Sequence, residues 1–222
     1  MKRISHHRFF LTASIVFYIS VFISLASADD GQGWLNNSVT FRMDSQFSLI
    51  LTQELRSHEV TYMDVYLTNW QGGLSYRLPH SFYVAFLYKR ENSKKRDFNL
   101  GENRLTLEGG WKKSLSSSLD VDCRFRTEIR RYDKELAKDH LRFRFRVRLR
   151  TRLKIGTLKT TPFIATEPFA DTLQDTIMRN RFYLGTGIVV GEHVEFKIMY
   201  IRQDTKGSDT VHIFNSGVDL KF

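Results

Sequence analysis

A run of residues near the middle of the chain, HLRFRFRVRLRTRLK at positions 140–154, places an arginine at every second position from Arg142 to Arg152. The positions between these arginines are apolar up to Leu149. Three interpretations compete: a nucleic-acid-binding arm, an amphipathic segment at a membrane surface, and a β-strand with one charged and one apolar face. In a helix, alternate arginines would spread around the whole circumference, and a nucleic-acid arm does not need strict apolar alternation. The run therefore predicts a strand.

The same period of two recurs from residue 47 to the C-terminus, and helical patterning is nearly absent. Short connections alternate with longer polar ones, which is typical of an outer-membrane barrel. We therefore predict an all-β fold, an antiparallel transmembrane β-barrel of the bacterial outer membrane with about ten strands, and twelve as the second count. An even count places both ends of the barrel at the rim of the short turns. The predicted strands are 47–58, 62–76, 82–92, 100–113, 118–133, 140–153, 158–170, 178–190, 193–205 and 209–222.

The N-terminal segment predicts export. Residues 1–28 combine the basic start MKRISHHR, a long apolar run and the small residues Ala-Ser-Ala, as in a secretory signal peptide. An uncleaved membrane anchor is the alternative. Residues 29–46 are then a lead-in or an extra strand, since 37–43 also alternates, and residues 47–222 form the barrel. The predicted location is the bacterial outer membrane.

The charged face of the arginine run is predicted to face the barrel lumen, where carboxylates of other strands must compensate it. The predicted lumenal charges are Arg142, Arg144, Arg146, Arg148, Arg150, Arg152, Asp120, Asp122, Arg124, Arg126, Glu128, Glu108, Glu54 and Glu167. Two functions stay open: a structural barrel whose lumen is filled with Arg–carboxylate pairs, or a narrow, porin-like pore that favours anions. The formal net charge of +10 agrees with an acidic partner.

The chain ends in NSGVDLKF, with a polar residue, a glycine, an apolar residue and a terminal aromatic at fixed spacing. This pattern, carried by Asn215, Gly217, Leu220 and Phe222, resembles the C-terminal signal that the barrel-assembly machinery reads in outer-membrane proteins. The resemblance implies that this machinery is a partner during insertion. The other predicted partners are outer-membrane lipid and lipopolysaccharide; no nucleic-acid partner is predicted, and the oligomeric state stays open.

The sequence contains no motif for catalysis or for a cofactor. A single cysteine, Cys123, excludes an intramolecular disulfide and a cysteine-based zinc site. Phosphate-binding glycine loops and the HExxH pattern are also missing from the sequence. We predict no catalytic residue, no metal, no cofactor and no enzymatic activity. The alternative is a barrel hydrolase that acts on envelope lipids, for which His58 and His140 are the candidate rim histidines.

Four blocks of sequence together resemble a known family. They are FSLILTQELR at 47–56, FLYKR at 86–90, PFIATEPF at 162–169 and RFYLGTGI at 181–188. In this order they resemble the outer-membrane barrel family catalogued as domain of unknown function 2490. The resemblance implies a single barrel and no established activity, so it transfers no functional residues. In FLYKR, Lys89 separates Tyr88 from Arg90, which leaves the facing of this strand open.

Overall fold

The computed structural model describes residues 31–59, 64–134, 137–173 and 177–222. The predicted signal peptide, residues 1–28, lies outside the described residues. Nearly all of the described chain is β-structure. The elements are β1 (Gly31–Arg42), β2 (Phe47–Ser57), β3 (Val65–Arg77), the 3₁₀ turn η1 (Pro79–Ser81), β4 (Phe82–Lys94), β5 (Asn99–Ser114), β6 (Leu119–Tyr132), β7 (His140–Thr151), β8 (Leu153–Ile155), β9 (Leu158–Asp171), β10 (Ile177–Val190), β11 (Val194–Thr205) and β12 (Val211–Lys221).

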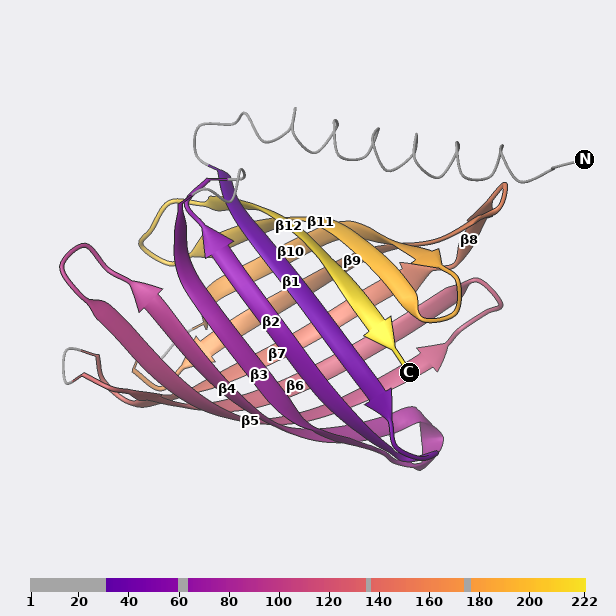
Figure 1. The fold of residues 1–222 in the computed structure, drawn as a ribbon, viewed down its shortest axis with the longest axis horizontal. Coiled ribbons are helices and arrows are strands. Elements are labelled where there is room, and N and C mark those ends of the chain that lie inside the picture. Colours follow the sequence, from indigo (N-terminus) through magenta and orange to yellow (C-terminus); the bar gives the residue numbers. More distant parts are fainter. Residues whose placement is uncertain (1–30, 60–63, 135–136, 174–176) are drawn as a thin grey trace, which may run out of the picture.

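The strands form one sheet that closes on itself into a barrel (Figure 1). The short strand β8 continues the path of β7, and its hairpin with β9 projects beyond the rim (Figure 1). Among the described residues, eleven full-length strands therefore surround the lumen, one more than the ten predicted. The additional strand is β1, which lies between β12 and β2. Without it those two strands would be open edges with unpaired backbone groups.

The pairing of β1 with β12 is parallel, whereas the other neighbouring strands pair antiparallel. An odd number of strands in an otherwise antiparallel barrel forces one parallel pair. As a consequence, β1 begins at the rim opposite to the one where Phe222 ends the chain. The prediction that both ends of the barrel lie at one rim is therefore wrong, because the number of full-length strands is odd and not even.

Gly217 makes this parallel seam possible. The register pairs Leu35 with Ser216 and Ser38 with Asp219, and between them the two backbones come unusually close. A Cβ atom at position 217 would lie 1.8 Å from the carbonyl oxygen of Asn36, a distance that no side chain can occupy. The backbone of the neighbouring strand thus requires a glycine here.

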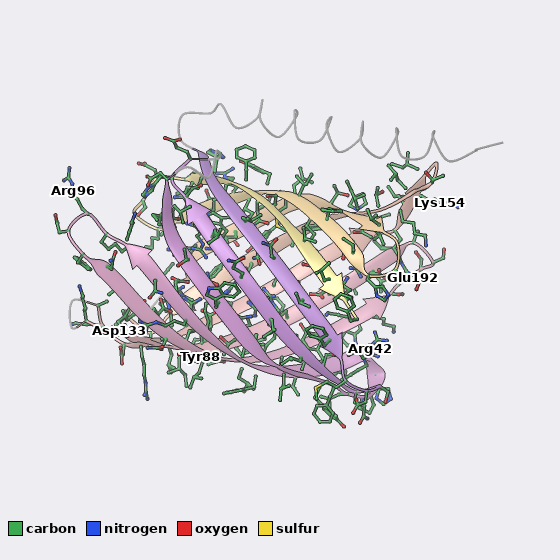
Figure 2. The ribbon with its side chains drawn as sticks, viewed as in Figure 1. Arg42, Tyr88, Arg96, Asp133, Lys154 and Glu192 are labelled. Atoms are coloured by element: carbon green, nitrogen blue, oxygen red, sulfur yellow. The ribbon has the colours of Figure 1, made fainter. Side chains whose placement is uncertain are left out.

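The connections at the two ends of the barrel differ. One rim carries the connections 43–46, 78–81, 115–118, 156–157 and 191–193; we call it the turn rim. The loop rim is the opposite end, where β2, β4, β6, β9 and β11 end and β3, β5, β7, β10 and β12 begin. Figure 2 shows Arg96 and Asp133 at the loop rim and Lys154 and Glu192 at the turn rim.

In the turn between β1 and β2, the backbone N–H groups of Phe47 and Gln46 donate hydrogen bonds to the Asp44 carboxylate. These bonds stabilise the charged form and lower the pKa of Asp44.

The outer face of the wall is apolar. The residues between the arginines of β7, among them Leu141, Phe145 and Leu149, are exposed, while the arginines are partly buried. Tyr88 also points away from the barrel (Figure 2), and the buried Lys89 lines the lumen. The alternation therefore continues through β4. Other exposed apolar side chains of this face are Leu51, Trp70, Leu74, Phe86, Leu107, Phe125, Ile164, Phe182 and Leu184.

We predict that two engineered cysteine pairs will both form disulfides across the seam. The pairs are Leu35→Cys with Ser216→Cys, and Ser38→Cys with Asp219→Cys, each combined with Cys123→Ser. Parallel strands bring both pairs within disulfide range, which a non-reducing gel detects. In an antiparallel seam aligned through the first pair, the second pair would lie about 20 Å apart. Formation of only one of the two disulfides would contradict the parallel seam.

Candidate functional site in the barrel lumen

Five of the six arginines of the 142–152 run lie on the inner face of β7, Arg152 directly follows the end of this strand, and each of the six forms an ion pair. The pairs and their N–O distances are Arg142–Asp171, 2.7 Å; Arg144–Glu128, 2.8 Å; Arg146–Asp122, 3.1 Å; Arg148–Asp122, 3.2 Å; Arg150–Asp120, 3.3 Å; and Arg152–Asp120, 2.8 Å. Four carboxylates therefore compensate the six arginines, and Asp120 and Asp122 each serve two of them.

The register between β6 and β7 explains two of these pairs. It places Asp120 opposite Arg150 and Asp122 opposite Arg148. Because both strands alternate with a period of two, their charged faces point into the lumen together. Directly opposed residues of opposite charge stabilise an antiparallel pair.

The most deeply buried part of the network is formed by Glu128 and Glu167, each 1% exposed. Glu167 on β9 accepts hydrogen bonds from Arg124 at 2.7 Å, from Arg144 at 2.9 Å and from the Tyr183 hydroxyl at 2.6 Å. A buried carboxylate needs several such donors to offset the loss of its hydration. Glu167 thus joins three strands of the wall through one carboxylate.

The remaining predicted charges extend the network. Glu108 on β5 accepts a hydrogen bond from Arg126, and Glu54 on β2 accepts one from Arg56. The ammonium nitrogen of Lys89 lies 3.8 Å from Glu54. The structure thus places the predicted lumenal charges on the inner face, except Arg152, which is half exposed at the turn rim.

The ion pairs run along the wall and do not cross the lumen. Among the described residues, each lumenal ion pair joins groups on the same strand, on adjacent strands, or on strands with one strand between them. The arrangement differs from a plug that fills the interior, and it leaves room in the centre.

A cavity of about 470 Å³ occupies that centre. Thirteen basic and four acidic side chains line it within the described residues. Most of the charges belong to the network on β5, β6, β7 and β9. The opposite wall carries fewer charges and includes the neutral Trp34, Asn36, Met199 and Ile201. A small solute in this cavity would therefore meet mainly positive charge.

Seven of the thirteen lining cations were not among the predicted lumenal charges, and Arg179 and Arg181 on β10 are two of them. The alternation of β10 does place Arg181 on the inner face, opposite to Phe182. Its register partner on β9 is Glu167, which would be expected to neutralise it. Sequence could not show that Arg124 and Arg144 already occupy Glu167.

The four residues of the C-terminal pattern lie on β12 and at its end. Asn215 is buried and lines the cavity, and Gly217 lies at the seam. Leu220 is on the outer face, paired in register with Val39 of β1. The Phe222 ring stacks on Phe41, and its backbone continues the pairing with β1. These residues therefore also contribute to closing the barrel.

The two candidate histidines, His58 and His140, contact groups other than a serine hydroxyl. His58 Nδ1 lies 2.6 Å from Asp64 Oδ2, but the neighbouring Ser57 hydroxyl donates to the carbonyl of Gly33 at 3.2 Å. The Nδ1 atom of His140 lies 3.0 Å from the carbonyl of Lys138. Within the described ranges, no three His, Cys, Asp or Glu side chains cluster as metal ligands.

No helix among the described residues has the length and apolar character needed to cross a membrane.

The fold and the inner charge pattern define a closed β-barrel of the outer-membrane type. Its fold is similar to the β-domain of the Bordetella autotransporter BrkA, with a TM-score of 0.53, 12% sequence identity and coverage of 82% of this chain and 86% of that chain. The family model "Protein of unknown function (DUF2490)" matches residues 31–213. The chain therefore belongs to the DUF2490 family. No curated protein matches the sequence.

We predict that Glu167→Gln destabilises the barrel far more than Asp120→Asn. The first change leaves the buried guanidinium groups of Arg124 and Arg144 short of a counter-charge, which costs about 3–5 kcal/mol. The second affects a pair at the turn rim, where Arg152 is half exposed, and costs at most about 1 kcal/mol. Urea unfolding in lipid vesicles measures both free energies of unfolding. Equal losses would contradict the assignment of the network centre to Glu167.

Proposed function

We propose that this protein is an integral outer-membrane barrel whose narrow, positively charged lumen favours small anions. The observation that carries the proposal is the lining of the central cavity by thirteen basic and four acidic side chains of the described residues. Such a surplus raises the local concentration of anions and opposes the entry of cations. The network keeps the ladder arginines against the wall, so that space remains between the walls.

The proposed location is the outer membrane, reached by export through the predicted signal peptide. The apolar outer face supports this location, since it suits contact with lipid and lipopolysaccharide. The fold that the chain shares with an autotransporter β-domain supports it as well. We further propose that the barrel-assembly machinery recognises the C-terminal strand, as the resemblance of its last residues implies.

A purely structural barrel is the second candidate, and the complete pairing of the ladder arginines favours it. In that case the network serves only to hold β6, β7 and β9 together. Hydrolysis of envelope lipids is not part of the proposal, because the hydroxyl beside His58 is bonded to a backbone carbonyl. The two candidates differ in one measurable property, the passage of ions.

We predict small, anion-selective currents in planar bilayers, measured from the reversal potential in a KCl gradient. Gln71→Glu adds a negative charge to the cavity lining and is expected to reduce the anion preference. Gln46→Glu makes the same change in an exposed turn and should leave the preference unchanged. A folded barrel without currents would favour the structural candidate, and cation selectivity would contradict the proposal.

A further inference from the structure

We propose that the lumen contains a binding site for a soluble, phosphate-bearing solute, formed by Arg56 and Arg181, which contact the indole ring of Trp34, and by the neighbouring Arg179. The inference rests on the proposed function and deepens it, because it specifies where an anion is held and by which donors.

The first observation is that Arg179 and Arg181 differ from the ladder arginines in their partners. The ion pairs of the described residues leave both without a carboxylate within 4 Å. Arg179 Nε donates to the hydroxyl of Thr205 at 3.3 Å, and Arg181 Nε donates to the side-chain oxygen of Gln203 at 2.8 Å. Neutral neighbours on β11 thus orient both side chains through Nε, while the terminal nitrogens remain for an acceptor in the cavity that both arginines line.

The second observation is a stack of two guanidinium groups on one aromatic ring. The Cζ atom of Arg56 lies 3.8 Å from the centre of the Trp34 ring, and that of Arg181 lies 4.8 Å from it. Trp34 is itself held by packing against Ile201 and Ile213. A guanidinium that stacks through its face keeps its N–H edge available for hydrogen bonds. The ring therefore preorganises two of the donors.

The third observation is the concentration of like charge. Arg179 lies close enough to Arg181 and Arg56 for their positive charges to repel one another. Glu54 acts on Arg181 and Asp171 acts on Arg179, but these two carboxylates are already paired with Arg56 and Arg142. An anion between these groups relieves the repulsion. Guanidinium groups match phosphate oxygens through paired N–H donors, so a phosphate group suits this cluster.

The position of the cluster indicates the source of the phosphate. All three arginines lie on inner strand faces and line the cavity of about 470 Å³. A lipid headgroup is tethered to chains on the outer side of the wall and does not reach the cavity. The volume exceeds that needed for a phosphate ion alone, which leaves room for a small organic part. The structure thus favours a soluble phosphate compound.

The test uses Trp34 as its own reporter. In a Trp70→Phe, Trp111→Phe background, the protein is refolded in a non-ionic detergent and titrated with inorganic phosphate at constant ionic strength. We expect a saturable change in Trp34 fluorescence. The double variant Arg179→Gln, Arg181→Gln should bind phosphate about a hundredfold more weakly, because each of its two lost charge-assisted hydrogen bonds weakens binding by about tenfold. The matched variant Arg150→Gln, Arg152→Gln removes two paired arginines and should change the affinity by less than about twofold.

Heat-modifiability on a gel shows that each variant is folded. Arg181→Lys keeps the charge but loses the planar pair of donors, so it should weaken phosphate binding and retain anion selectivity. An unsaturable signal, or equal losses in the two double variants, would overturn the site. Tighter saturation by a short-chain phosphatidate than by inorganic phosphate would overturn the soluble source.

Bilayer currents of the same samples separate this inference from the proposed function. Anion-selective currents without saturable phosphate binding would overturn the site alone, whereas wild-type currents that favour cations would overturn the proposed function.

Discussion

The alignment of charged inner faces on β6, β7 and β9 is the interaction on which the rest of this barrel depends. Six consecutive inward arginines on β7 would repel one another strongly in a lumen of this size. The register places Asp120 and Asp122 directly against them, and Glu167 reaches them from the other side. Because these pairs follow the wall, they stiffen the sheet and leave a central cavity.

Closure of the wall imposes a second requirement. Eleven full-length strands in the described chain close only through one parallel pair, and β1 and β12 form it. At one point of this parallel pair, the carbonyl of Asn36 comes so close to position 217 that only a glycine fits there. Residues of the C-terminal pattern thus serve the seam in the finished barrel, whatever their role during insertion.

The alternation in the sequence was sufficient to predict the β-barrel fold. It also predicted that β7 turns its arginines toward the lumen, where carboxylates of other strands lie beside them. It predicted a strand count that was one too low, because the only signal for β1 was a short alternating stretch before residue 47. The cluster around Trp34 was missed for another reason. Whether Arg181 is neutralised depends on competition for Glu167 among strands that a single sequence does not place side by side. The alternation of a strand shows whether a residue lies on the inner or the outer face of the barrel. Which carboxylate an inward arginine pairs with depends on how the strands are aligned in three dimensions.

The central claim is that the ladder arginines are compensated by the wall while those of β10 are available to an anion. Crystals soaked in bromide test it directly, since anomalous scattering locates the bound halide. We expect anomalous peaks beside Arg179 and Arg181 and none along Arg142 to Arg152. Peaks along β7, with none near Trp34, would contradict it.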